Sequence, residues 1–249
     1  MLFTGDHPSE PTKPQWLFGP KPLAPELAPL EQYQQLNWLR PLDLAFVRWL
    51  HDQGEPNVVV LLLAALLSHQ VGRGHTCLDL QQLLEQTNDS LDLPPNGRAY
   101  LASSTPQQWL AGQQLETLQQ ALQQSIQVQV ITRGENQQAP LVLDGKRLYL
   151  RRYFNYETQV AQALLGRLQQ QFTLPNDLPE QLQRLFAPLK DRAERQGHEI
   201  HWQSVAAAVA ARSGISIISG GPGTGKTTTV VRLLALLQGM SLVAEGVDG

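Results

Sequence analysis

The chain has 249 residues, a formal net charge of −3 and a single cysteine, Cys77. This length can hold one large domain or two modest ones, each with a hydrophobic core. The slightly acidic balance argues against a strongly basic nucleic-acid binder, although it permits a local basic groove. One cysteine excludes an internal disulfide framework and suits a reducing compartment. The most apolar run, residues 58–67, is far shorter than the ~20 residues of a membrane span, and the N-terminus lacks the apolar core of a signal peptide. We therefore predict a soluble cytoplasmic protein with no membrane partner.

The first 30 residues are interrupted by prolines, at Pro8, Pro11, Pro14, Pro20, Pro22, Pro25 and Pro29. Closely spaced prolines prevent a helix or a central strand. We therefore predict that residues 1–30 are a disordered or polyproline-like extension. Such an extension is either a tolerated terminal tail or a segment that docks on a partner.

Helical patterns follow from residue 31. Pro41 opens one helix, and Asn57 is the expected N-cap of a second, residues 58–69, which is apolar on all sides and therefore central to a helical core. Leucines at 80–84 indicate a third, short helix. A fourth, residues 112–127, is rich in glutamine, and its glutamine side chains form either a solvated face or a contact with a partner chain.

Strand patterns come next, at residues 128–131 and in a hairpin over residues 141–150. Asp144-Gly145 in the middle of the hairpin favours a type I′ turn. Basic residues surround it, and they belong either to a solvated hairpin or to a surface that contacts nucleic acid or an acidic partner: Lys146, Arg147, Arg151 and Arg152. Helices are predicted at 156–171 and 204–212, with Pro175, Pro179 and Pro188 interrupting the region between them.

The strongest motif is Gly-Gly-Pro-Gly-Thr-Gly-Lys-Thr at residues 220–227, which fits the phosphate-loop pattern G-x-x-x-x-G-K-[ST]. Residues 215–219, rich in β-branched side chains, predict a short buried strand before the loop. Residues 229–238 carry apolar side chains at helical spacing and end at Gly239. A strand, a glycine loop and a helix in this order indicate a nucleoside triphosphate site.

The residue types explain the chemistry of this predicted site. Glycines let the backbone turn tightly so that successive N–H groups point at phosphate oxygens, and the following helix adds the positive end of its dipole. Lys226 is expected beside the β and γ phosphates, and the Thr227 hydroxyl is the expected Mg²⁺ ligand. The residues predicted to bind nucleotide are Gly220, Gly221, Pro222, Gly223, Thr224, Gly225, Lys226, Thr227 and Thr228.

Two other groups of residues are weaker candidates. Gln203 precedes the helix that leads into the loop, and its amide complements the N6 and N7 edge of adenine. His69, His75 and Cys77 lie within nine residues and carry atoms that zinc accepts. Because structural zinc sites usually have four ligands and no fourth is evident, a helix end followed by a glycine turn is the better interpretation.

Several stretches resemble the RecD family, the alpha subunits of exodeoxyribonuclease V. They are residues 39–43, 63–69, 74–78, 141–150, 202–209 and 217–229. The resemblance implies an α/β chain with a mainly helical partner-binding domain and β-hairpin over residues 31–155, then the first part of a RecA-like, superfamily 1 helicase domain over residues 156–249. The proline-rich extension over residues 1–30 precedes these two parts and is not explained by the resemblance.

The resemblance also implies a function. A member of this family is a 5′–3′ DNA helicase subunit that uses ATP and Mg²⁺ within the RecBCD complex. Its partners are RecB, RecC and single-stranded or double-stranded DNA ends, and the complex serves double-strand-break repair and homologous recombination. The N-terminal domain docks on RecC, the nuclease centre lies in RecB, and Gln203 is similar to the family's adenine-contacting glutamine.

The pattern departs from the family at its end. Between Lys226 and Gly249 there is no room for the carboxylate pair, the arginine and the second RecA-like domain that a helicase motor uses. We therefore expect a truncated chain that carries the loop without the rest of the motor. An alternative is an interaction module that docks on RecC and hydrolyses nothing. A third interpretation is a different P-loop ATPase, such as a small kinase or a loader.

Overall fold

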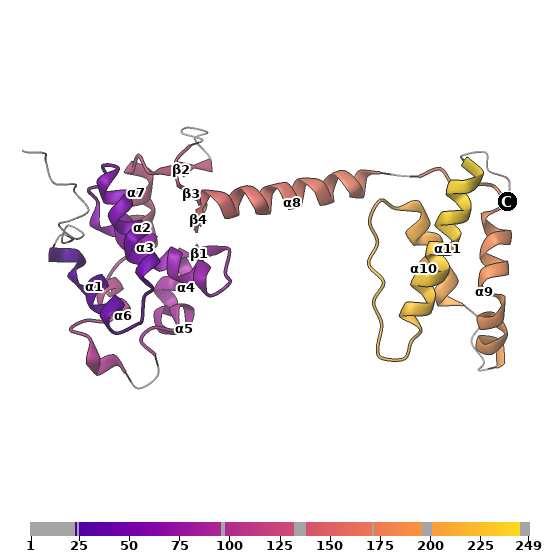
Figure 1. Ribbon diagram of the computed structural model, residues 1–249, viewed down its shortest axis with the longest axis horizontal. Coiled ribbons are helices and arrows are strands. Elements are labelled where there is room, and N and C mark those ends of the chain that lie inside the picture. The colour runs from indigo at the N-terminus through magenta and orange to yellow at the C-terminus, as the bar shows by residue number, and fades with distance from the viewer. Residues whose placement is uncertain are drawn as a thin grey trace, which may run out of the picture. The chain divides into compact units, whose positions relative to one another are not determined.

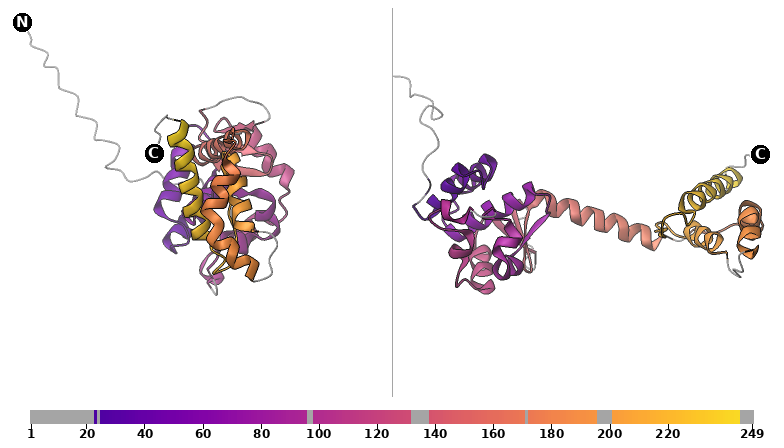
Figure 2. Two further views of the ribbon diagram at one scale, coloured as in Figure 1. Left: turned by 90° about the vertical axis from the view of Figure 1, so that its right-hand side faces the viewer. Right: turned by 90° about the horizontal axis from the view of Figure 1, so that it is seen from below.

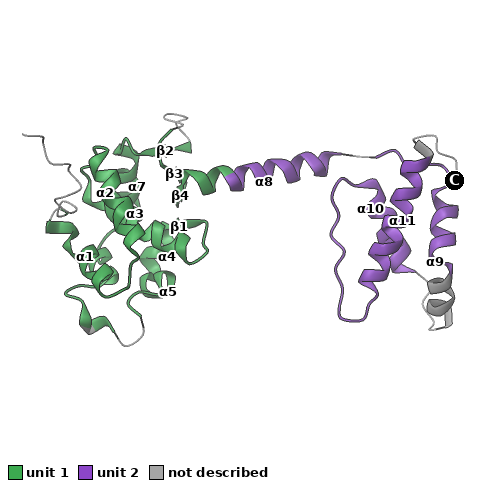
Figure 3. Cartoon of the chain, viewed as in Figure 1, with its two compact units in different colours: residues 1–155 green, residues 156–249 purple. Residues whose placement is uncertain are grey.

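A computed structural model describes residues 23, 25–95, 98–131, 138–170, 172–195 and 201–244. The chain is mixed helix and sheet and divides into two compact units, residues 1–155 and 156–249 (Figure 3). Within the described ranges, no helix is long and apolar enough to cross a membrane. The two units are taken separately below as unit 1 and unit 2.

Unit 1 is built from short helices around α3 (Figure 1). Its helices are η2 (Pro25–Leu27), α1 (Ala28–Gln35), α2 (Pro41–Asp52), α3 (Val58–Gly72), α4 (Leu80–Glu85), α5 (Thr87–Leu91), η3 (Ala99–Leu101), α6 (Pro106–Leu110) and α7 (Leu115–Gln124). Residues 60–67 of α3 are all buried. A helix that is apolar on every side is stable in water only when other elements surround it, so α3 is the centre of the core.

The start of α3 confirms the predicted N-cap. The Asn57 side-chain oxygen accepts a hydrogen bond from the Val59 N–H at 2.9 Å, which satisfies one of the donors left free at a helix start. Helix α2 begins at Pro41, as predicted, because proline at the first helical position sacrifices no intrahelical hydrogen bond. Helix α7 is shorter than the predicted residues 112–127.

A buried carboxylate joins α2 to α3. Asp43 is fully buried and accepts hydrogen bonds from Ser68 Oγ and Arg40 Nη2, both at 2.7 Å. The same Arg40 nitrogen donates to the Ser68 carbonyl at 2.6 Å, and the guanidinium covers Gly72 so closely that an added Cβ would lie 2.1 Å from Arg40 Cζ. This network fixes the end of α3 against the start of α2.

One sheet of four strands completes unit 1. Its strands are β1 (Cys77–Asp79), β2 (Val128–Val130), β3 (Leu141–Asp144) and β4 (Arg147–Leu150), in the order β1-β4-β3-β2. Strands β2 and β3 are parallel, and the other pairs are antiparallel. The predicted hairpin is confirmed. Strand β1 was missed because three residues are too few to show an alternating pattern.

The turn of the hairpin differs from its prediction. Asp144 pairs with Arg147, so the two loop residues are Gly145 and Lys146 rather than Asp144 and Gly145. Of these two, only Gly145 has a positive φ, 56°. A positive φ at the first central position alone matches a type II′ turn, whereas type I′ requires it at both positions.

The predicted extension over residues 1–30 is too long. Residues 1–22 and 24 lie outside the described ranges, but residues 25–30 form η2 and the start of α1, and Leu27 and Leu30 are buried. Pro29 lies in the first turn of α1, where its missing N–H has no intrahelical partner to lose. Proline at this place starts a helix instead of preventing one.

Unit 2 contains α8 (Arg151–Gln169, which begins in unit 1), α9 (Leu178–Arg195), α10 (Trp202–Arg212) and α11 (Lys226–Ala244). Helix α10 lies beside α11 (Figure 2), and Leu178, Ala211 and Leu236 form the small buried core between the last three helices. Two boundaries were predicted wrongly. Helix α9 continues through the position of Pro188, and α11 does not end at Gly239.

The predicted strand at residues 215–219 is not formed. These residues have no strand assignment, and Ile217 is 91% exposed. A strand is held by hydrogen bonds to a neighbouring strand, and within the described part of unit 2 no strand is present to supply them. The backbone between α10 and the glycine loop is therefore irregular and exposed.

Candidate functional site

The glycine loop connects this irregular segment to α11, which begins at Lys226. Two of its glycines adopt conformations that other residues avoid: φ is 75° at Gly223 and 81° at Gly225. Only glycine reaches these angles without steric cost. The sequence pattern that singled out these positions therefore corresponds to real turns of the backbone.

The Lys226 side chain folds back across the loop. Its ammonium donates hydrogen bonds to the carbonyl oxygens of Gly220 and Gly221, each at 2.7 Å. The Thr224 hydroxyl also donates to the Gly221 carbonyl, at 2.9 Å. The loop thus holds a positive charge at its centre, supported by its own backbone oxygens.

The first turn of α11 faces the same place. The first N–H groups of a helix have no intrahelical partner, and together with the helix dipole they favour an anion. Thr227 and Thr228 are exposed there, whereas Thr229 is buried and its hydroxyl donates to the Gly225 carbonyl at 3.0 Å. Thr229 was missed as a supporting residue. Its position shortly after the motif was the signal in the sequence that could have identified it.

Gln203 lies directly against the loop. Its Nε2 donates to the Thr224 carbonyl at 2.9 Å, and a Cβ added to Gly225 would lie only 2.4 Å from that nitrogen. The amide oxygen of Gln203 is buried and has no hydrogen-bond partner among the described residues. The structure therefore brings all the predicted nucleotide-site residues together, including the one that is distant in sequence.

Aromatic and charged side chains connect the helices of unit 2 that flank the loop. His201 Nδ1 accepts from the Ser204 N–H at 3.2 Å and caps α10, one residue before Trp202. The His201 ring lies 5.7 Å from that of Phe186, and the Arg232 guanidinium lies 5.4 Å from the same Phe186 ring. These contacts connect α9, α10 and α11. Sequence reasoning missed them because each joins residues far apart in the chain.

His69, His75 and Cys77, the three candidate zinc ligands, lie among the described residues of unit 1. His69 Nε2 lies 2.9 Å from the Leu91 carbonyl, and burial lowers the pKa of His69 below its ordinary value of 6.5. In the part of the chain that the structure describes, no three His, Cys, Asp or Glu side chains gather as metal ligands. Helix α3 ends at Gly72, and Gly74 follows with a φ of 95°, so this stretch contains the predicted helix end and glycine turn.

The basic residues around the hairpin use several of their donors within unit 1. Lys146 donates to Gln81 Oε1 at 2.8 Å, and Arg151 Nε donates to the Ala139 carbonyl at 2.9 Å. Burial lowers the pKa of Arg151. Both observations favour a structural role for these two cations over a free nucleic-acid surface.

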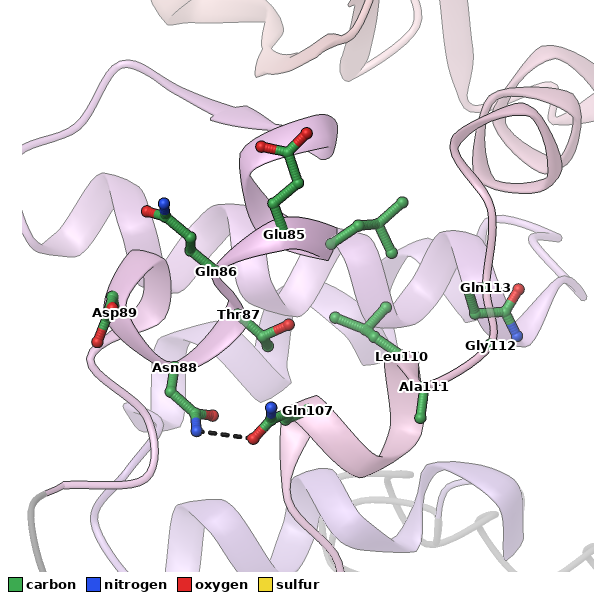
Figure 4. A pocket seen from close by; sticks show the side chains of 11 residues that line it. Glu85, Gln86, Thr87, Asn88, Asp89, Gln107, Leu110, Ala111, Gly112 and Gln113 are labelled. Carbon is green, nitrogen blue, oxygen red and sulfur yellow. Dashed lines mark hydrogen bonds between the residues drawn. The ribbon is translucent and has the colours of Figure 1, made fainter.

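A hollow of about 450 Å³ in unit 1 lies where α4, α5 and α6 meet (Figure 4). Asn88 and Gln107 point toward one another across it, and Asn88 Nδ2 donates to Gln107 Oε1 at 2.8 Å. Glu85 and Asp89 contribute carboxylates. Among these described lining residues, no side chain forms a nucleophile and base pair.

Comparison with known proteins identifies the family that the chain resembles. A family model described as "RecBCD enzyme subunit RecD, N-terminal domain" matches residues 35–149. Over these residues the chain is similar to the RecD family. The match covers most of unit 1, with α2, α3 and the hairpin that the sequence had singled out.

Individual relatives extend the likeness beyond unit 1. RecD of Haemophilus influenzae is 33% identical over 220 residues, which are 85% of this chain and 33% of that protein. RecD of Mycolicibacterium smegmatis is 32% identical over 190 residues, 76% of this chain and 27% of that protein. RecD of Mycobacterium tuberculosis is 43% identical over 94 residues. All three are named as subunits of the RecBCD enzyme. The chain spans a third or less of the length of these relatives.

Proposed function

We propose that the chain carries the ATP-binding loop of a RecD-type subunit, an ATP-dependent 5′–3′ DNA helicase acting within a RecBCD (exodeoxyribonuclease V) complex. The role would be in double-strand-break repair and homologous recombination. The observation that carries this proposal is the combination of a RecD N-terminal domain and a complete glycine loop in one chain. A small kinase or a loader would share the glycine loop, but it would not be expected to contain a RecD N-terminal domain.

The residues at the loop fit Mg-ATP. Lys226 would neutralise the charge of the β and γ phosphates, and the Thr227 hydroxyl would hold Mg²⁺. The N–H groups at the start of α11 would bind phosphate oxygens. The amide oxygen of Gln203 has no hydrogen-bond partner among the described residues, and it would accept from an adenine amino group once exposed to the base. Bound Mg-ATP supplies the phosphoanhydride bond whose hydrolysis drives movement along DNA.

Substitution of Lys226 tests this proposal. We expect Lys226→Ala to weaken Mg-ATP binding to the chain by at least about tenfold, since a charge-assisted contact to phosphate contributes roughly 1.5–3 kcal/mol. We also expect loss of DNA-stimulated ATP hydrolysis when the subunit is assembled with RecB-type and RecC-type partners. Calorimetric titration and phosphate release measure the two effects. Unchanged values in both assays would contradict the proposal.

The relatives' printed names support RecB and RecC as partners, and we propose both for this chain. We propose DNA ends as a further partner on the basis of the family resemblance. The alternative function, a module that docks on RecC without hydrolysing ATP, is favoured by one observation in unit 1. Leu42 and Trp49 on the outer face of α2 are 63% and 46% exposed, and the Trp49 ring stacks on Phe46 at 6.1 Å. Exposed apolar side chains at helical spacing, tryptophan above all, are typical of surfaces that bind a partner protein.

Two variants separate the functions. Deletion of residues 200–249 leaves unit 1 complete, so capture of a RecC-type subunit should survive it if unit 1 does the docking. Trp49→Ala should weaken that capture by about 1–2 kcal/mol, whereas Ile126→Ala, also at an exposed site (66%), should not. Loss of capture after the deletion, with Trp49→Ala silent, would place the docking surface outside unit 1.

A further inference from the structure

The Gln203 side chain touches the loop at its backbone. Its Nε2 bonds the Thr224 carbonyl at 2.9 Å, across 21 positions of sequence, and its amide group lies against Gly225. Gln203 projects from the first turn of α10, which His201 caps and which packs beside α11. The donor is therefore fixed by a helix, while the acceptor belongs to a loop.

Fixing the Thr224 carbonyl also fixes the next amide. The peptide between Thr224 and Gly225 is planar, and in a trans peptide the C=O and N–H bonds point in opposite directions. Holding the carbonyl toward Gln203 therefore turns the Gly225 N–H away from Gln203. In a glycine loop that binds phosphate, such N–H groups are the donors that face the anion.

A side chain at position 225 would disturb the same contact. Its φ of 81° already favours glycine, and any Cβ would also meet Gln203 Nε2 at 2.4 Å. The two residues fit each other closely, and the peptide between Thr224 and Gly225 has little freedom to rotate while the hydrogen bond holds.

We infer that Gln203 is a positioning residue for the phosphate loop, which orients the Gly225 N–H toward a bound triphosphate. This role is separate from contact with the base, and it rests on the proposed function because it requires a phosphate ligand in the loop. The positioning role uses one amide hydrogen on the Thr224 carbonyl and requires neither the oxygen nor the second hydrogen of Gln203. Replacement of Gln203 should therefore also weaken the binding of phosphate ligands that have no base.

The test compares Mg-ATP with Mg-tripolyphosphate, an inorganic triphosphate without base or sugar. Dissociation constants are measured by calorimetry for the whole chain and for Gln203→Met, which keeps the length of the side chain without its hydrogen bonds or any charge. We expect Gln203→Met to weaken tripolyphosphate binding about three- to tenfold, the net effect of one hydrogen bond. ATP should weaken by at least as much.

Gln119→Met is the matched control. Gln119 Nε2 also donates to a backbone carbonyl at 2.9 Å, that of Gly145 in unit 1, and its loss should leave both dissociation constants unchanged. Gln203→Asn is a second variant, because it keeps the amide but shortens the reach to Thr224 by one methylene. Gln203→Asn should weaken tripolyphosphate binding as Gln203→Met does. Hydrogen exchange at residues 221–225, without ligand, should be faster in both Gln203 variants.

The outcomes are distinct. Weaker ATP binding with unchanged tripolyphosphate binding would overturn the inference and leave Gln203 as a base contact only. Unchanged binding of both ligands would overturn it as well. If the wild-type chain binds neither ligand, the proposed function itself fails and the inference fails with it. That case is recognised from the wild-type titration alone.

Discussion

Unit 1 surrounds its most apolar helix on every side, whereas the helices of unit 2 leave much of their apolar surface exposed. Residues 60–67 of α3 are buried without interruption, while Val231 and Leu234 of α11 are each 60% exposed. Burial of apolar area is the main source of folding free energy. The stability of unit 1 therefore comes from its core, and the candidate chemistry of unit 2 comes from loop geometry held by individual hydrogen bonds.

The largest expected effect comes from a pair of leucine substitutions that compares the two units. Leu63→Ala in α3 removes a fully buried side chain, and we expect it to lower the free energy of unfolding of unit 1 by about 3–5 kcal/mol through lost burial and a cavity. Leu234→Ala in α11 should change stability by no more than about 0.5 kcal/mol. Urea unfolding followed by circular dichroism measures both. Equal losses in the free energy of unfolding would show that unit 2 depends on apolar burial as strongly as unit 1.

A smaller effect is expected at the buried carboxylate. Asp43→Ala removes the carboxylate that accepts from Ser68 Oγ and Arg40, leaving the guanidinium with its bond to the Ser68 carbonyl, and we expect a loss of about 2–3 kcal/mol. Asp52→Ala, at the exposed end of the same helix, is the control and should stay within about 0.5 kcal/mol. A silent Asp43 variant would mean that apolar packing alone joins α2 to α3.

The smallest expected effect depends on pH. Burial lowers the pKa of His69 in the folded state, Arg40 and Arg73 lower it further, and Asp43 and the Leu91 carbonyl oppose the shift. The unfolded state therefore binds a proton first as the pH falls through 6.5, and unit 1 should lose stability below that pH until His69 is protonated in the folded state too. Unfolding curves between about pH 8 and pH 5 test this. His69→Gln should flatten the dependence, and an equally steep curve in that variant would assign the effect to another group.

Local chemistry explains which features the sequence could predict. The N-cap at Asn57, the proline start of α2 and the turning points of the glycine loop each depend on a few neighbouring residues, so their patterns are visible in the chain. The strand expected at residues 215–219 failed because a strand also needs a partner, which no local pattern supplies. Gln203 was selected for its place before the loop, yet its contact with Thr224 spans 21 positions and could not be foreseen.

The short strands at both edges of the sheet have a consequence for how unit 1 behaves in concentrated solution. Strands β1 and β2 are the two edges, and each has three residues. An edge this short exposes few unpaired N–H and C=O groups for another chain to extend. The sheet thus offers little template for intermolecular pairing, and unit 1 is protected against edge-to-edge aggregation by the brevity of its outer strands.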